Sequence, residues 1–259
     1  MNLRLAALLA LLVGSLSMGR PVNGAIVFSD DFNAYTDGNL VGQGGWVQLG
    51  SSVVNQVQVS SGSVVNLTTG QDVQKPFSSV VARAAGEANG EILVTEFDLN
   101  LSSAGDDDFF AHITVSPGNT TFFNRFYSQA GTAPGTFQLA VSASIVSGGV
   151  VNLNYGGDLL LGQTYHVQSR WDFLPGTLND QFSLKIDGAP YVAPFAWDSG
   201  TAESTNLGVF NLRQGGGDAP GVASIDNVVV THIVPEPATF ALAAFAALGV
   251  AFVSTRRKG

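Results

Sequence analysis

Several residue types that carry common protein chemistry are absent or scarce in this chain. There is no cysteine among the 259 residues, which excludes disulfide frameworks, thiolate metal sites and cysteine nucleophiles. Charged residues make up only 12% of the chain, about half of their share in an ordinary soluble domain. Lysine and arginine total 11 against 20 aspartates and glutamates, so the formal net charge is −9. So few basic residues exclude the positive patch that nucleic-acid binding requires.

Glycine is abundant, and a helical pattern is missing. The chain has 31 glycines, a share well above the usual ~7%. Between residues 25 and 234, short alternating or β-branched runs recur, separated by glycine, asparagine, aspartate and proline. No proline-rich linker divides this region. We therefore expect one all-β domain, an antiparallel β-sandwich of roughly twelve strands, rather than two smaller domains.

Alternating runs of apolar and polar residues carry the strand prediction. The run over 92–101 alternates from Thr95 onward, which places Phe97, Leu99 and Leu101 on one face. The other clear runs cover residues 137–145, 165–173, 182–188 and 222–233. The runs over 165–173 and 182–188 are expected to form an antiparallel pair.

The first 24 residues are typical of a secretory signal peptide. Arg4 precedes an apolar run over 5–13, small residues follow, and Gly24 stands at a small-residue cleavage position. A transmembrane anchor or a buried helix is the alternative, but the apolar run is too short to span a bilayer comfortably. We expect cleavage after Gly24 and export of the rest of the chain.

The last residues, 235–259, have three parts in a fixed order. A stiff Pro-Glu-Pro segment comes first, an apolar run over 238–253 follows, and a basic end closes the chain. As a transmembrane helix the run would be about 24 Å long, slightly shorter than a ~30 Å hydrocarbon core. The basic end would then lie on the cytoplasmic side. The residues that carry these signals are Pro235, Glu236, Pro237, Arg256 and Arg257.

This three-part tail resembles the PEP-CTERM sorting signal, which exosortase membrane proteases recognise in bacteria. The resemblance implies transient insertion into the inner membrane, processing near the Pro-Glu-Pro motif, and release to the cell surface or extracellular matrix. Such proteins occur in bacteria that make extracellular polysaccharide, so a polysaccharide is the implied partner. A plain C-terminal membrane anchor is the alternative.

Without its two ends, the chain is strongly acidic. Residues 25–234 contain six lysines and arginines against 19 aspartates and glutamates, a net charge of −13. Such a surface repels anionic polymers and attracts divalent cations. Neutral glycans or a calcium-bridged matrix are therefore the partners that the net charge favours.

Several segments of this region resemble concanavalin A-like and laminin G-like jelly rolls. The segments are 162–167, 180–188 with its Asp-Gly end, the opening 30–32 and 44–46, and the closing 225–230. The resemblance implies a jelly roll in which the first and last strands pair. The fold by itself does not specify a function.

Laminarinase-type glycoside hydrolases of this fold carry a Glu-x-Asp-x-x-Glu strand, whose two carboxyl groups perform retaining hydrolysis. Here Glu96 and Asp98 match, but Leu101 stands in place of the second glutamate. The three histidines lack the spacing of a zinc site. We therefore expect no catalytic residue and no enzyme activity. The expected function is glycan binding or a structural role in the matrix, and the alternative is a glycoside hydrolase or polysaccharide lyase with an unrecognised site.

Two further sets of residues are candidates for a site. Calcium takes several oxygen ligands, and pairing of the first and last strands would bring Asp30 and Asp31 close to Asp226. Solvated carboxylates at strand ends are the alternative interpretation. Exposed aromatic rings would stack on sugars, although Trp171 also fits the alternation of a core strand. The aromatic candidates are Trp46, Tyr127, Trp171 and Trp197.

Overall fold

The structure is a computed structural model and describes residues 22–49, 57–65, 72–82, 90–104, 108–114, 122–144, 150–174, 179–197, 206–215 and 222–235. Residues 24–233 form one compact unit. The apolar runs over 5–13 and 238–253 lie outside the described residues. Within the described part of the chain, no helix is long and apolar enough to cross a membrane.

Every regular element of the described residues is a β-strand. The long strands of the first half are β1 (Val22–Asp30), β6 (Asp72–Val81), β7 (Ile92–Ser103), β8 (Asp108–Thr114) and β9 (Phe122–Ala130). Those of the second half are β10 (Thr136–Ser144), β11 (Val150–Leu160), β12 (Thr164–Asp172), β13 (Asp180–Ile186), β14 (Ala189–Trp197), β15 (Leu207–Gly215) and β16 (Val222–Pro235). Four short strands complete the set: β2 (Gly38–Asn39), β3 (Val47–Gln48), β4 (Gln58–Ser60) and β5 (Ser63–Val65).

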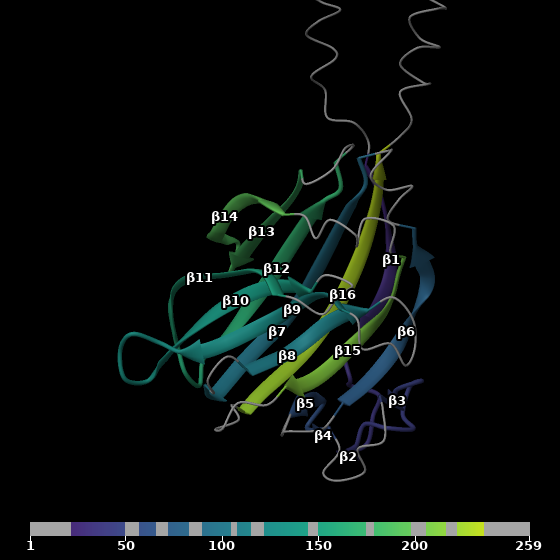
Figure 1. Ribbon diagram of the computed structural model, residues 1–259. Coiled ribbons are helices and arrows are strands. Elements are labelled where there is room, and N and C mark those ends of the chain that lie inside the picture. The colour runs from purple at the N-terminus through teal and green to yellow at the C-terminus, as the bar shows by residue number, and fades with distance from the viewer. Residues whose placement is uncertain are drawn as a thin grey trace, which may run out of the picture. The chain divides into compact units, whose positions relative to one another are not determined.

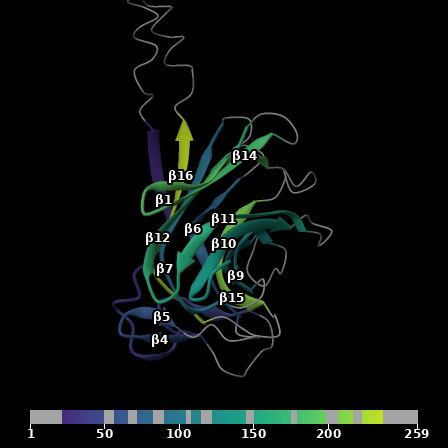
Figure 2. The same cartoon turned by 90° about the vertical axis from the view of Figure 1, so that its left-hand side faces the viewer.

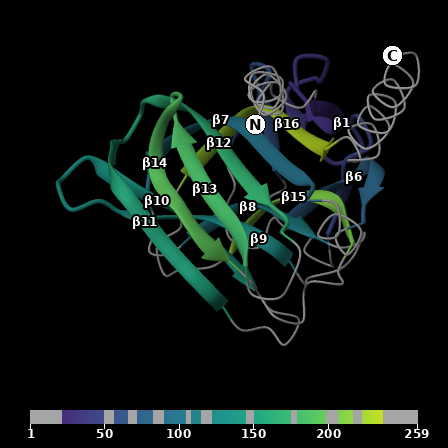
Figure 3. The same cartoon turned by 90° about the horizontal axis from the view of Figure 1, so that it is seen from above.

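The strands form two sheets (Figure 1). The nine-stranded sheet has the order β14-β13-β12-β7-β16-β5-β4-β2, with β1 paired to β16, and the seven-stranded sheet has the order β11-β10-β9-β8-β15-β6-β3. Figure 3 shows β14, β13 and β12 side by side at one end of the nine-stranded sheet. The strand pairs with a described register are antiparallel, which confirms the all-β antiparallel fold.

The alternating runs of the sequence correspond to β7, β10, β12, β13 and β16. The expected pair of β12 and β13 is present, with Trp171 opposite Phe182. The first and last strands also pair, and β1 and β16 lie side by side in Figure 2. There are more strands than the sequence predicts, because β2 to β5 have only two or three residues each. An alternation of two or three residues is too short to recognise.

The two sheets pack face to face around one hydrophobic core. Phe97 and Leu101, both on β7, are 0% and 1% exposed. Phe97 meets Phe126 of β9 edge-on, with ring centroids 4.9 Å apart. Phe28 of β1 stacks on Phe210 of β15 at 5.1 Å. Each aromatic pair joins strands of different sheets, as expected for a β-sandwich.

A two-residue turn fixes the register between β13 and β14. Asp187 and Gly188 have φ values of 50° and 78°, the left-handed combination that a type I′ turn requires. Asp187 also accepts a hydrogen bond from the backbone N–H of His166 at 2.8 Å. The Asp-Gly end that the sequence singles out is therefore the hairpin turn that ties β12, β13 and β14 together.

Candidate functional site

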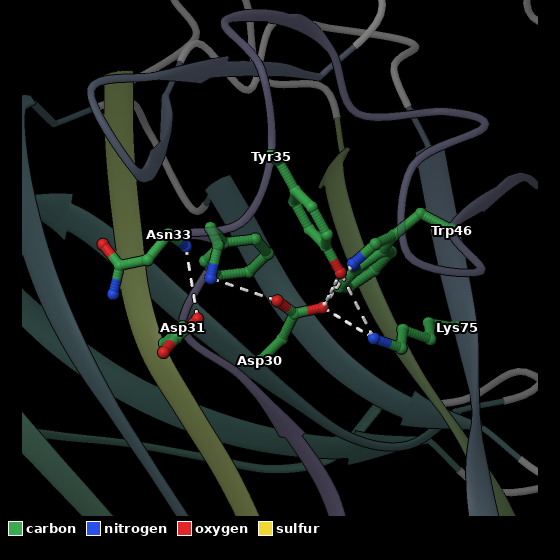
Figure 4. Close-up of polar contacts among 7 residues, drawn as sticks. Asp30, Asp31, Asn33, Tyr35, Trp46 and Lys75 are labelled. Atoms are coloured by element: carbon green, nitrogen blue, oxygen red, sulfur yellow. Dashed lines mark hydrogen bonds and ion pairs between the residues drawn. The ribbon is translucent and has the colours of Figure 1, made fainter.

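A buried ion pair anchors the end of β1 (Figure 4). Asp30 Oδ2 accepts hydrogen bonds from Tyr35 OH at 2.7 Å and Trp46 Nε1 at 2.8 Å. The ammonium of Lys75 lies 2.7 Å from the same oxygen. The backbone N–H of Phe32 donates to Oδ1 at 3.1 Å. The side chain of Asp30 is only 5% exposed and that of Lys75 is 21% exposed.

This cluster links the two sheets, because Asp30 ends β1 and Lys75 lies on β6. The ammonium is also 5.6 Å from the ring centroid of Phe28 and 6.0 Å from that of Trp46, within the range of cation–π attraction. Burial is the main cause that raises the pKa of Tyr35, and its hydrogen bond to Asp30 raises it further. The charge of Asp30 is thus neutralised by a cation of the protein itself.

The calcium prediction included Asp30, and the structure argues against that residue as a ligand. A calcium ion at Asp30 would have to displace the ammonium of Lys75. Asp31 is exposed, and together with Asn227 it lines a cavity of about 350 Å³. Within the described residues, no group of three or more histidine, aspartate or glutamate side chains could hold a metal ion. Calcium held by Asp31 and Asp226 remains a prediction that needs its own test.

The predicted sugar-stacking aromatics have different surroundings. Trp46 and Trp171 are both 0% exposed, so neither ring has a face open to a sugar, and the prediction is corrected for these two residues. Trp171 packs against Phe182, with ring centroids 4.4 Å apart. Tyr127 is also buried, at 8% exposed, although it does not belong to the core cluster. Trp197 ends β14, and its side chain lies outside the described residues.

The partial hydrolase motif lies on the outer face of the nine-stranded sheet. His166 of β12 lies beside Glu96 and Asp98 of β7, with Nδ1 2.9 Å from Asp98 Oδ1 and Nε2 3.6 Å from Glu96 Oε1. The hydrogen bond to Asp98 is the main cause that raises the pKa of His166. Leu101 is 1% exposed and belongs to the core. This strand therefore lacks the second glutamate of laminarinase-type hydrolases.

A row of polar residues crosses the seven-stranded sheet. Gln74 of β6 lies opposite Asn211 of β15. Asn211 lies opposite His112 of β8, and His112 lies opposite Arg125 of β9. Arg125 in turn lies opposite Ser142 of β10. These five strands are neighbours in the sheet, so the five residues share one level, and we call them the polar row.

The described side chains of the polar row, those of Gln74, Asn211, Arg125 and Ser142, lie on the face of the sheet that is turned away from the core. The chain neighbours of its members belong to the core, as Phe126, Val141 and Phe210 do, and successive strand residues point to opposite faces. Asn211 and Ser142 are nonetheless 0% exposed, and Ser142 Oγ has no hydrogen-bond partner in the described part of the chain. A buried hydroxyl without a partner costs free energy, so stability does not account for Ser142 in this row.

A cation and a phenol meet near the centre of the polar row. Arg125 and Tyr127 are two residues apart on β9 and therefore share a face. Arg125 Nη1 donates a hydrogen bond to Tyr127 OH at 2.8 Å, and the guanidinium carbon lies 6.0 Å from the ring centroid. A guanidinium can pair with a carboxylate through two hydrogen bonds. Among the described side chains of this face, Gln74, Asn211, Ser142 and Tyr127 are buried, whereas Arg125 is partly exposed. Arg125 is therefore the group of this face that a sugar carboxylate can reach.

The sequence singles out Tyr127 but not the members of the polar row. The members of the polar row come from distant parts of the chain, and only the pairing of strands aligns them. The spacing of Arg125 and Tyr127 was the one available signal. Lys75 was also missed, because a lysine in an alternating strand is usually solvated.

Comparisons with known proteins identify the C-terminal tail. The PEP-CTERM protein-sorting motif matches residues 234–258, which include the Pro-Glu-Pro segment and the basic residues of the predicted signal. The chain is therefore an exported protein, processed at the membrane, that an exosortase-type enzyme recognises. No curated protein matches the chain.

Solved structures share the jelly-roll fold. The alginate lyase Aly36B, in complex with alginate tetrasaccharide, covers 80% of this chain and 97% of its own, with a TM-score of 0.51 and 16% identity. SCLam, a non-specific endo-β-1,3(4)-glucanase of family GH16, covers 83% and 93%, with a TM-score of 0.47 and 14% identity. An alginate lyase from Klebsiella pneumoniae covers 71% and 86%, with a TM-score of 0.46 and 13% identity. At these identities the likeness shows the fold alone.

This likeness overturns the expectation that the chain is not an enzyme. That expectation rested on Leu101 in place of the second glutamate of one catalytic strand and on the lack of zinc-site spacing among the three histidines. The same fold occurs in an alginate lyase, so the absence of the laminarinase carboxylate pair does not exclude activity.

Proposed function

We propose that the exported protein binds a polysaccharide at the cell surface or in the extracellular matrix, and that the binding face lies at the polar row, where Arg125 is the partly exposed side chain that contacts the ligand. The alignment of polar residues from five neighbouring strands at one level of the sheet, with the side chain of Arg125 on the outer face, carries the proposal. Binding sites place a few polar groups in sheltered surroundings, where they fix the orientation of the ligand. The fold that the chain shares with Aly36B, which was solved with alginate tetrasaccharide, supports a polysaccharide as the ligand.

The positive charge of Arg125 favours a ligand whose sugars carry a carboxylate. Its guanidinium can pair with a uronate, whereas the net charge of −13 on residues 25–234 favours neutral glycans. The charge of the whole domain acts over distance and is screened beyond about 8 Å at physiological salt. A contact pair in a sheltered row is screened much less. We therefore expect a uronate-containing polysaccharide to bind better than a neutral β-glucan at physiological salt.

Calorimetric titration of residues 25–234 with uronate oligosaccharides tests the binding face. Hydrogen bonds to a charged group contribute about 1.5–3 kcal/mol, so Arg125→Gln should raise Kd about 10- to 100-fold. Arg170→Gln is the matched control, because Arg170 pairs with Asp172 on the outer face of the other sheet. Unchanged binding by Arg125→Gln, or an equal loss in both variants, would contradict the proposal.

A second candidate function, cleavage by β-elimination, is favoured by the contact between Arg125 and Tyr127. In this reaction the C5–H and C4–O bonds of a uronate break, a C4=C5 double bond forms, and the leaving glycosidic oxygen takes a proton. Arg125 would neutralise the carboxylate that makes the C5 proton acidic. The hydroxyl of Tyr127, 2.8 Å from that guanidinium, would give its proton to the leaving glycosidic oxygen, and its oxygen would take up the proton that leaves C5.

The ultraviolet absorbance of the new double bond tests cleavage directly. Wild-type protein incubated with a uronate polysaccharide should produce it, and Tyr127→Phe should bind the polymer but release at least tenfold less product. An absence of product with wild type would remove the cleavage candidate and leave the binding proposal standing. Product formation that is unchanged in Tyr127→Phe would refute the role of this residue.

A further inference from the structure

The last strand of the sandwich runs directly into the sorting motif. β16 extends from Val222 to Pro235, and the PEP-CTERM match begins at residue 234. The strand and the motif therefore overlap, and no linker separates the folded domain from the segment that the membrane enzyme recognises.

The end of β16 is held on both sides within the compact unit. On one side, Thr231, His232 and Ile233 lie opposite residues of β7, with Ile233 opposite Ile92. His232 Nε2 also lies 2.5 Å from Glu91 Oε2, in a pair whose side chains are 16% and 7% exposed.

β1 holds the other side of the same strand end. β1 pairs with β16, and a Cβ atom placed on Gly24 would lie 2.9 Å from Thr231 Cγ2. Gly24 is the last residue before the expected cleavage position, so the part of β1 from Ala25 onward is the neighbour that remains after export. The residues just before the sorting motif are therefore part of an inner strand of the sheet, with their backbone groups engaged by neighbours.

A protease that binds an extended segment needs the same backbone groups. Such a cleft pairs with the main chain of its substrate, as an added strand would. One N–H or C=O group cannot face β7 and a protease cleft at once. We propose that residues 231–235 form the segment that the exosortase-type enzyme binds, and that this end of β16 must leave β7 before processing.

The rate of processing then depends on how often the strand end opens. Local opening of a strand end has its own equilibrium, separate from global unfolding. The pair of His232 and Glu91 opposes this opening, and a hydrogen bond to a charged group is worth about 1.5–3 kcal/mol. Glu91→Gln should therefore speed processing about tenfold or more.

A disulfide clamp tests the proposal sharply, because the chain contains no cysteine. Ile92 and Ile233 are opposite each other on antiparallel strands, where Cα atoms lie about 4.5–5.5 Å apart, within the range of a disulfide. The double variant Ile92→Cys/Ile233→Cys therefore pins the end of β16. Asn100→Cys/Ser224→Cys is the matched control, because these residues pair on the same two strands away from the end.

The assay follows processing of the full chain in membranes that contain the exosortase-type enzyme, with and without a reductant. The Ile92/Ile233 clamp should slow processing at least tenfold when oxidised, and reduction should restore the wild-type rate, which also shows that the variant folds. The Asn100/Ser224 clamp should be processed at the wild-type rate in both states. Processing of the oxidised Ile92/Ile233 clamp at the wild-type rate would overturn the proposal, and so would Glu91→Gln processed no faster than wild type.

Discussion

The buried pair of Asp30 and Lys75 should be a major contributor to stability. Asp30→Asn leaves the ammonium of Lys75, 21% exposed, without a counter-charge. Loss of one partner of a buried pair costs about 3–5 kcal/mol, and the partial exposure of Lys75 places this case near about 3 kcal/mol. For a domain of this size, 1 kcal/mol shifts Tm by about 2–4 °C. Thermal unfolding of residues 25–234, followed by circular dichroism, should therefore show a loss of about 6–12 °C.

Asp31→Asn is the control for this experiment. Asp31 is the next residue, is exposed, and accepts only one described hydrogen bond, from the backbone N–H of Asn33 at 3.2 Å. Its substitution should change stability by no more than about 0.5 kcal/mol. The double variant Asp30→Asn/Lys75→Met should recover part of the loss, because it removes both charges. Equal midpoints for Asp30→Asn and Asp31→Asn would refute the reasoning.

Three further predictions can be tested by thermal unfolding. If Asp31 and Asp226 hold calcium, a hundredfold excess of calcium over Kd should add about 2.7 kcal/mol to the free energy of unfolding. The midpoint in millimolar calcium should therefore lie several degrees above that in EDTA, and Asp226→Ala should abolish the shift; an unchanged wild-type midpoint would contradict this. The pKa of His166 is raised in the folded protein, so the contribution of His166 to the free energy of unfolding is fully present below about pH 6.5 and is lost as pH rises through the folded pKa. His166→Gln should therefore lower the free energy of unfolding more at pH 5.5 than at pH 8.5. An equal loss at the two pH values would contradict this prediction. The pKa of Asp158 is lowered to about 2, chiefly by the hydroxyl and backbone N–H of Thr132, so the deficit of Asp158→Asn should shrink as pH falls from 4 towards 2, and a constant deficit would exclude this linkage.

The long strands could be predicted from the sequence, because burial of one face imposes an alternation of apolar and polar residues. β7 and β12 show this pattern over nine or more residues, and the Asp-Gly turn after β13 has a recognisable composition. The short strands β2 to β5 could not be predicted, because they are held by pairing with neighbours and not by a pattern of their own.

The site could be predicted only in part, because register between distant strands is not visible in the sequence. Lys75 lies 45 residues beyond Asp30, and only the packing of the two sheets brings them together. An aromatic residue such as Trp46 is equally compatible with a core position and a sugar-binding face. Gln74 and Asn211 become neighbours through the pairing of β6 with β15. No local sequence pattern predicts this pairing.

Hydrogen exchange of residues 25–234, measured by mass spectrometry with and without uronate oligosaccharides, tests the central claim most directly. The account predicts that the ligand slows amide exchange in β8, β9, β10 and β15, around Arg125 and Asn211, and leaves β7 and β12 unchanged. Protection in β7 and β12 instead, or no protection at saturating ligand, would contradict the assignment of the polar row as the polysaccharide site.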